Sequence, residues 1–272
     1  MSVTQNGESG RSDAALAAEL AVAAGQLLLA VRAANPQIGG SELKDLGDHS
    51  AQALLAERLG QARPDDCVLS EEAADDLRRL QADRVWIIDP LDGTREYSEG
   101  RDDWAVHVAL WQRAERPQRS DVWQGGNLVA GAVALPGLDT VLSTDPASVV
   151  PTAVAGAALR MAVSRSRPPA LAQALTERLG LVPVPMGSAG YKVAAVVRGE
   201  VDLYVHAGGQ YEWDSAAPVA VALAAGLHAS RIDGSPLVYN QENVLLPDLV
   251  VCRPELAAAV LAEIANIAEV SA

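Results

Sequence analysis

The chain has 272 residues, of which 49% are hydrophobic and 21% are charged, and its formal net charge is −14 at pH 7. This composition excludes a disordered chain, and the length favours two closely packed subdomains. The negative charge argues against non-specific binding to nucleic acid or to a membrane surface, although bound cations would still allow a small anionic substrate.

The first twelve residues are polar and lack the apolar core of a secretory signal. No uninterrupted apolar run looks long enough to span a bilayer, so we expect a cytoplasmic protein without a membrane partner. The two cysteines, Cys67 and Cys252, lie far apart in the sequence. They predict buried reduced thiols rather than a disulfide framework.

Two helices are expected in the first 62 residues. Ser12 predicts the N-cap of a long helix that ends before Pro36. The apolar face of this helix carries Leu16, Leu20, Leu27, Leu28 and Val31. A second helix is expected to start at Asp48, which on this evidence alone is simply its N-cap.

Residues 67–69 predict a short strand that leads into Ser70-Glu71-Glu72. Paired acids at this point have two interpretations. They are either charges in the first turn of a helix or ligands at the carboxyl edge of a sheet.

The most informative stretch is Trp86 to Thr94. Residues 85–88 are bulky and apolar and predict a buried strand that stops at Asp89. Pro90 redirects the chain, and Asp92-Gly93-Thr94 has the composition of a tight turn that opens a helix. Two acids three residues apart at such a corner offer the oxygen ligands that Mg²⁺ prefers, and Gly93 lets backbone N–H groups approach an anion. The stretch therefore predicts a metal-assisted phosphate site.

The remaining elements alternate between strands and helices. Strands are expected at residues 104–110, 127–135, 140–143, 159–163, 182–186, 201–205 and 249–252, with an exposed hairpin loop at 113–126. Helices are expected at 170–179, from 187–190 to about 198, from 213–215 to 226, and from 254 onwards. Residues 146–156 mark the predicted boundary between an N-terminal subdomain, 1–150, and a C-terminal subdomain, 151–272. This alternation predicts layered sheets with helices packed between them.

Four acids share one pattern. Each falls where a strand ends or a helix begins, and they are Glu71, Asp89, Asp92 and Asp214. One such acid is usually a cap, but four beside a phosphate-type turn point to a metal site.

These residues carry a family resemblance. The stretch Trp86–Thr94 with its upstream Ser70-Glu-Glu72, and Glu212 to Ala217, resemble the two signatures of the inositol monophosphatase-like family of metal-dependent phosphatases. The continuation Thr94-Arg-Glu-Tyr97 resembles the CysQ branch of that family, which hydrolyses 3′-phosphoadenosine 5′-phosphate. Segments 164–167, 187–192 and 234–239 also resemble that branch, most closely its actinobacterial members.

The resemblance implies an α/β (α+β) fold, a layered αβαβα sandwich. It implies metal ligands at Glu71, Asp89, Asp92 and Asp214 and at the backbone carbonyl of Leu91. Asp48, raised above the cap interpretation, pairs with Thr94 to orient the attacking water, and Glu71 takes part in catalysis. Two Mg²⁺ ions are implied; a third stays open because residues 43–47 are abbreviated and lack the threonine usual before the outer aspartate.

The resemblance also implies the substrate contacts. Gly93 and Thr94 hold the departing phosphate, and Asp92 and Asp214 are further substrate-binding residues. Nucleotide contacts fall on Arg167, Ser188, Ala189, Lys192 and His206. Arg167 stands where the branch has a histidine, and His206 stands where it has an arginine. The implied partner is adenosine 3′,5′-bisphosphate, the implied assembly is a homodimer, and the implied activity is sensitive to lithium.

Other interpretations stay open. Within the family, the substrate would be an inositol monophosphate or fructose 1,6-bisphosphate. A haloacid-dehalogenase-type mechanism would make Asp89 or Asp92 a nucleophile, but that family spaces its aspartates two apart and would leave Glu71 idle. A non-catalytic nucleotide sensor is the alternative from another class. His49, His107 and His228 lack metal-ligand spacing and are expected to be structural, and Trp213 is expected to belong to the core.

Overall fold

The computed structural model describes residues 11–114, 125–153, 156–166 and 168–271. The first half of the chain forms a five-stranded sheet with the order β1-β2-β3-β4-β5. Its strands are β1 (Cys67–Ser70), β2 (Arg84–Asp92), β3 (Ala105–Arg113), β4 (Gly126–Leu135) and β5 (Thr140–Ser143). Only β1 and β2 run parallel; the other neighbours are antiparallel.

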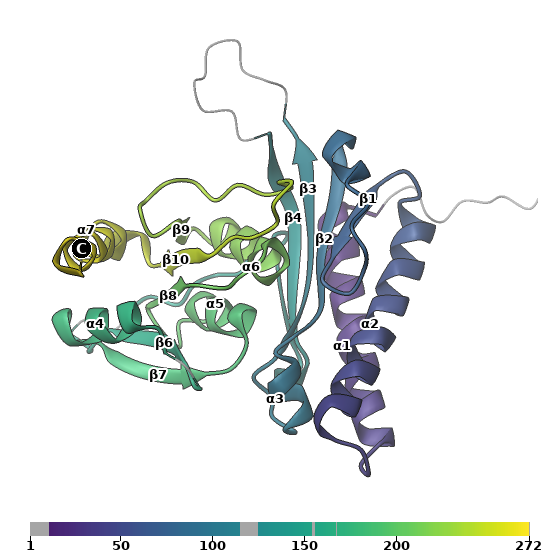
Figure 1. The fold of residues 1–272 in the computed structure, drawn as a ribbon, viewed down its shortest axis with the longest axis horizontal. Helices are drawn as coiled ribbons and strands as arrows, with labels where there is room; N and C mark the ends of the chain where they lie inside the picture. Colours follow the sequence, from purple (N-terminus) through teal and green to yellow (C-terminus); the bar gives the residue numbers. More distant parts are fainter. Residues whose placement is uncertain (1–10, 115–124, 154–155, 167, 272) are drawn as a thin grey trace, which may run out of the picture.

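The central strand β2 is buried on both faces because its side chains are apolar without interruption from Val85 to Ile88. Trp86 and Ile88 face the helices α1 (Asp13–Ala34) and α2 (Gly40–Ala62), whereas Ile87 faces the interior of the molecule. Figure 1 shows α1 and α2 covering one face of this sheet. The corner that ends β2 therefore follows a strand that is packed on both faces of the sheet.

Helix α1 corrects one expectation. By length and composition it could cross a membrane, although 44% of its most apolar window is buried inside the molecule. Leu16, Leu20 and Leu28 pack against the sheet in one core cluster, and the Ser12 hydroxyl accepts from the Ala15 amide at the helix start. Core helices of soluble proteins pass the same test of length and composition, so we interpret α1 as a core helix.

A second five-stranded sheet has the order β7-β6-β8-β10-β9. Its strands are β6 (Arg160–Ser164), β7 (Val182–Met186), β8 (Leu203–Ala207), β9 (His228–Ser230) and β10 (Asp248–Cys252). The other helices of the described residues are α3 (Thr94–Ser98), α4 (Ala170–Arg178), α5 (Ala189–Val197), α6 (Glu212–Ala224) and α7 (Ala257–Ser271), with short 3₁₀ turns at Arg78–Gln81, Pro136–Leu138 and Pro254–Leu256.

The elements stack in five layers, seen from right to left in Figure 1. Helices α5 and α6 lie between the two sheets and share a core cluster with β2, β3, β8 and β10. Helices α4 and α7 cover the outer face of the second sheet. The expected αβαβα sandwich is confirmed. We propose that the boundary between the subdomains lies in the connection from β5 to β6, because each sheet belongs to one half of the chain.

Several bounds differ from the sequence expectations. Helix α2 begins at Gly40, so Asp48 lies in its interior and the expected N-cap is wrong. The abbreviated segment 43–47 is helical as well. Strand β8 starts two residues later than expected, and β9 and the turn at Arg78–Gln81 had not been predicted. Most of the predicted hairpin loop, residues 115–124, lies outside the described residues. Cys67 and Cys252 are free, as expected, although Cys67 is only partly buried.

Candidate active site

The corner after β2 sets the position of the first two acids. A bulge between Asp89 and Asp92 interrupts the pairing with β3, and the Leu91 amide donates to Asp89 Oδ1 at 3.0 Å. Gly93 follows with φ +92°, a left-handed conformation that glycine adopts without steric cost. Helix α3 begins at Thr94. The predicted turn and helix are therefore present, but the strand does not stop at Asp89, because β2 continues through the bulge at Pro90 and Leu91 to Asp92.

Three carboxylates meet at this corner. Asp89 and Asp92 come from β2 and Asp214 comes from the first turn of α6. Each offers one oxygen, and these oxygens lie within 4.8 Å of one another. Three oxygen donors on rigid elements suit a hard divalent cation such as Mg²⁺. The residues present therefore fit a metal site.

The charges of these acids repel one another. Burial and the neighbouring charge of Asp92 raise the pKa of Asp214 to about 6. Burial and the charges of Glu71 and Asp92 raise the pKa of Asp89 well above its usual value. A bound cation would relieve both effects, because it stabilises the ionised carboxylates that burial disfavours.

The pKa of Asp92 shifts in the opposite direction from the pKa values of Asp89 and Asp214. Burial opposes its ionisation, but the His107 ring and hydrogen bonds from Ser188 and Gly190 hold the pKa of Asp92 at about 2. The Gly190 amide donates to Oδ2 at 2.6 Å, the Ala189 amide donates to Oδ1 at 3.2 Å, and the Ser188 hydroxyl donates to Oδ2. The start of α5 therefore binds an acid of the first sheet.

Glu71 and Asp48 are predicted site acids that do not belong to the cluster of three carboxylates. Glu71 follows the last residue of β1 in a turn, so the helix interpretation of Ser70-Glu-Glu72 is wrong. Lost hydration and the charges of Asp214 and Asp92 raise the pKa of Glu71 to about 7. Lost hydration and the charge of Glu72 also raise the pKa of Asp48 to about 7. Glu71 is thus coupled to the cluster, although its oxygens are not among the three that lie closest together.

The role of Asp48 with Thr94 stays a prediction. No hydrogen bond among the described residues joins the two side chains. Both lie on elements that frame the corner, since α2 packs against α3 and Thr94 is the first residue of α3.

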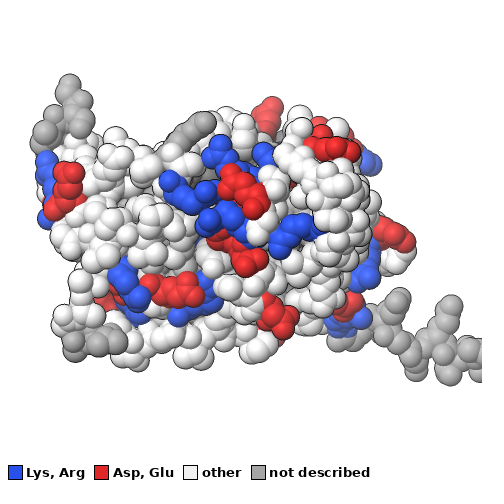
Figure 2. Space-filling model, turned by 90° about the horizontal axis from the view of Figure 1, so that it is seen from below, with Lys and Arg blue, Asp and Glu red and all other residues white. Residues whose placement is uncertain are grey.

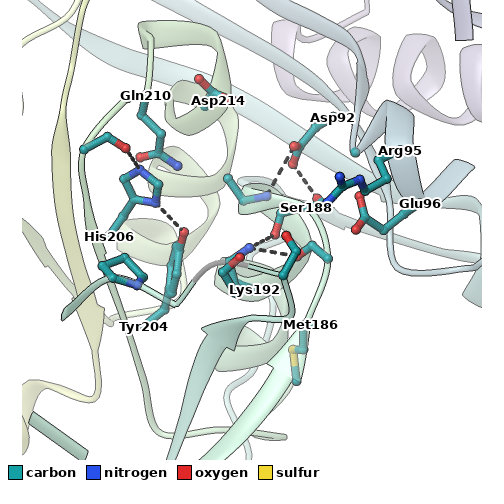
Figure 3. Close-up of a pocket in the computed structure, with 18 of the residues that line it drawn as sticks. Asp92, Arg95, Glu96, Met186, Ser188, Lys192, Tyr204, His206, Gln210 and Asp214 are labelled. Atoms are coloured by element: carbon teal, nitrogen blue, oxygen red, sulfur yellow. Dashed lines mark hydrogen bonds between the residues drawn. The ribbon is translucent and has the colours of Figure 1, made fainter. Parts of the chain in front are cut away.

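A cavity of about 540 Å³ opens beside the acids (Figure 3). It lies between the α3 corner and the second sheet. The predicted site residues that line it are Asp92, Gly93, Thr94, Ser188, Ala189, Lys192, His206 and Asp214. Asp89, Leu91, Glu71 and Asp48 are not among its lining residues, and Arg167 lies outside the described residues.

Lys192 is the buried cation of this cavity. Its ammonium donates to the carbonyls of Gly187 at 2.8 Å and Ser188 at 2.5 Å, and it lies 5.2 Å from the Tyr204 ring centroid. Burial lowers the pKa of Lys192 to about 8, so it is still mostly charged at neutral pH. Within the described part of the chain these two carbonyls accept two of the three ammonium N–H groups, which leaves the third for an anion.

The face at the α3 end of the molecule carries mixed charge. Figure 2 shows basic side chains gathered near the middle of this face, with acidic ones among them. Ion pairs near α3 join Arg165 to Glu96 and Glu99, and Arg101 to Asp103. Arg95 lines the cavity on the same side. Basic and acidic side chains therefore lie side by side at the mouth of the cavity, in a protein whose net charge is −14.

His107 is a fully buried histidine outside the acid cluster, in line with the structural role expected for it, but its contact with the site was not predicted. Its Nε2 lies 3.3 Å from Asp92 Oδ2 and its Nδ1 lies 3.1 Å from the Trp213 carbonyl oxygen. The signal that could have found it is strand pairing, because Asp89 and His107 are directly opposite in the β2–β3 ladder. Trp213 packs partly buried against the core, in line with its expected role.

The raised pKa values predict how stability depends on pH. Unfolded aspartate and glutamate lose their protons near 3.8 and 4.5, whereas folded Asp214, Glu71 and Asp48 keep them until about pH 6 to 7. The folded state then binds more protons, so the free energy of unfolding of the metal-free protein should fall as pH rises from about 4 to about 7. Urea unfolding in EDTA at pH 5.5, 6.5 and 7.5 measures this fall.

Glu71→Gln serves as the control, because it removes one of these groups and should make the decline shallower. Added Mg²⁺ should raise Tm more at pH 7.5 than at pH 5.5, since metal binding requires deprotonated ligands. A metal-free stability that is constant over this range would contradict the electrostatic description.

Comparisons with known proteins agree with this geometry. Residues 11–269 match the inositol monophosphatase family. The chain is 53% identical over 250 residues to the 3′-phosphoadenosine 5′-phosphate phosphatase of Mycobacterium tuberculosis, covering 89% of this chain and 90% of that protein. It is 53% identical over 265 residues to the phosphatase of the same name from Mycobacterium leprae, covering 94% of each. Among solved structures, CysQ from Bacteroides thetaiotaomicron matches with a TM-score of 0.75 and 24% identity, covering 90% of this chain and 98% of that one.

Proposed function

The chain belongs to the inositol monophosphatase family, and from this premise we propose that it hydrolyses the 3′-phosphate of 3′-phosphoadenosine 5′-phosphate to give adenosine monophosphate and phosphate. The observation that carries the proposal is the cluster of Asp89, Asp92 and Asp214 at the end of a 540 Å³ cavity lined by Lys192. The two mycobacterial relatives named for this activity support the choice of substrate.

The family is metal-dependent, and we propose Mg²⁺ as the metal. Glu71, Asp89, Asp92, Asp214 and the Leu91 carbonyl would hold two ions, with a third left open. The ions would supply Lewis-acid stabilisation of the phosphate and a more acidic water. Lithium would inhibit by taking the place of one of them.

The protein groups position the reactants. Asp48 and Thr94 orient the attacking water, with Glu71 beside them, and Gly93 and Thr94 hold the departing phosphate. Lys192, Ser188, Ala189 and His206 lie along the cavity where the nucleotide would extend. This positioning lowers the barrier because the water and the phosphorus atom are held in line. Arg167 is proposed as a further nucleotide contact from the resemblance alone.

A dimer remains a proposal from the resemblance, and a cytoplasmic location remains a proposal from the composition of the sequence. No nucleic acid or membrane partner is proposed.

Phosphate release tests the proposal directly. We expect the wild-type protein with Mg²⁺ to have a kcat/KM for 3′-phosphoadenosine 5′-phosphate that exceeds those for inositol 1-phosphate and fructose 1,6-bisphosphate by orders of magnitude, and added Li⁺ to lower it. Comparable rates on all three substrates would favour a permissive phosphatase of the same family. No release from any of them would overturn the enzyme proposal in favour of a nucleotide sensor.

A further inference from the structure

The wall of the cavity opposite α3 is formed by the end of β8 and the segment that follows it. Tyr204, His206 and Gln210 lie there, across the cavity from Arg95 and Glu96 (Figure 3). A nucleotide with its 3′-phosphate at the acid cluster has room to extend toward this wall. The polar groups of the wall therefore decide what the far part of the substrate meets.

His206 is already engaged by the protein. Its Nε2 lies 2.6 Å from the Gly208 carbonyl oxygen, and its Nδ1 lies 2.9 Å from the Tyr204 hydroxyl. Because a carbonyl only accepts, Nε2 carries the proton and Nδ1 accepts from the hydroxyl. Burial lowers the pKa of His206, which favours this neutral form. His206 can offer the face of its ring to a ligand, but neither nitrogen is free.

Gln210, in contrast to His206, has a side chain without hydrogen-bond partners among the described residues. The residue is 2% exposed, and within the described part of the chain neither the amide oxygen nor the amide nitrogen of its side chain has a hydrogen-bond partner. Figure 3 shows the carboxamide beside the His206 ring, at the wall of the cavity, and both of its polar atoms are covered by the protein. A buried amide without partners is costly, and natural proteins rarely keep one unless another molecule satisfies it. No hydrogen bond opposes the side-chain rotation that would turn this amide onto a bound ligand.

The chemistry of the Gln210 carboxamide indicates which part of the ligand it would contact. A carboxamide presents one donor and one acceptor side by side and carries no charge. A phosphate would instead meet Lys192 and Arg95, the cations that line the cavity. The edge of adenine presents a donor and an acceptor side by side, which glutamine pairs with in a bidentate way. The neutral amide therefore matches the base and not the second phosphate.

We propose that Gln210 is a specificity-determining residue that hydrogen-bonds the edge of the adenine base, an inference that rests on the proposed function. The base lies against the wall of β8, while the phosphates lie toward the acid cluster and Lys192. Gln210 then distinguishes a nucleotide from other small bisphosphates.

The test compares two substrates in Gln210→Met, which keeps the length of the side chain and removes its strong donor and acceptor. The substrates are 3′-phosphoadenosine 5′-phosphate and methyl β-ribofuranoside 3,5-bisphosphate, which has the same phosphates and no base. We expect kcat/KM for the nucleotide to fall about tenfold to a hundredfold, and kcat/KM for the base-free substrate to stay the same. Tm should not fall, because an unpartnered polar group has been removed. Gln61→Met changes an exposed side chain of α2 and should leave kcat/KM unchanged for both substrates.

Equal losses on both substrates, or no loss on either, would overturn the inference while leaving the activity intact. If the wild-type protein released no phosphate from the nucleotide, the proposed function itself would have failed. The wild-type measurement thus separates the two failures.

Discussion

Asp214→Asn is expected to lower kcat for 3′-phosphoadenosine 5′-phosphate by at least about a thousandfold, which corresponds to roughly 4 kcal/mol of lost transition-state stabilisation. Asparagine has the same shape and keeps an oxygen that can accept from the Tyr211 amide, the bond that now closes the start of α6 at 2.7 Å. What disappears is one of three charges within 4.8 Å of one another. The variant should therefore fold normally and fail to bind metal productively.

Two measurements check this prediction, namely phosphate release at saturating Mg²⁺ and the rise in Tm caused by Mg²⁺. Both should be lost in Asp214→Asn. Glu212→Gln is the matched control, since Glu212 lies two residues away in α6 and bonds the backbone amides of Asn240 and Gln241 instead. Glutamine can accept from only one of these two amides, so Tm of Glu212→Gln should fall, but phosphate release and the rise in Tm caused by Mg²⁺ should persist.

Retention of a tenth or more of the wild-type rate in Asp214→Asn would contradict the metal-ligand role. It would favour the mechanism in which Asp89 or Asp92 attacks the phosphate, because that mechanism does not depend on the charge of Asp214.

Gly190→Ala is expected to damage both stability and activity. A Cβ atom at this position would lie 1.8 Å from His107 Nε2 and 3.0 Å from Asp92 Oδ2, where no atom fits without movement. Forcing a methyl group into such packing lowers the free energy of unfolding by about 1–3 kcal/mol. The start of α5 would also shift away from Asp92, and a displacement of about 1 Å at a catalytic group lowers kcat/KM by about a hundredfold.

Gly60→Ala is the control for this change. Gly60 lies in α2, and a Cβ there would meet no atom within 4 Å. Alanine should therefore raise the free energy of unfolding by about 0.5–1 kcal/mol and leave kcat/KM unchanged. Equal behaviour of the two variants in urea unfolding would show that the contact between α5 and the β2 corner is not tight.

The corner after β2 could be predicted because its signals are local. An apolar run and Asp-Gly-Thr indicate a strand, a turn and a helix within ten residues, and residues 85–94 form them, with the difference that β2 runs through Pro90 to Asp92 instead of stopping at Asp89. The convergence of Asp214 on Asp89 and Asp92 was also predicted, but from the pattern of four acids and the family resemblance together. The pattern of apolar residues alone could not have predicted that α6 lies beside β2.

The features that were missed depend on contacts between distant segments. Asp48 looked like a helix start because no strong signal precedes it, and only packing of α2 against the sheet shows that the helix begins at Gly40. His107 is buried as expected, but its contact with Asp92 was not predicted because the sequence does not reveal its register against Asp89. Gln210 has no motif at all. Its significance comes from hydrogen bonds that it does not make among the described residues, which no sequence pattern can indicate.

The three hydrogen bonds from the start of α5 to Asp92 connect the candidate metal site to the contact between the two halves of the molecule. If the two halves moved apart, Asp92 would lose the donors that favour its ionised form, and its affinity for a cation would change with it. By thermodynamic linkage, a bound cation must in turn favour the closed arrangement of the two halves. Substitutions that shift α5 against the first sheet would then change the affinity for the metal, so we expect the two halves of the chain to be constrained together during evolution.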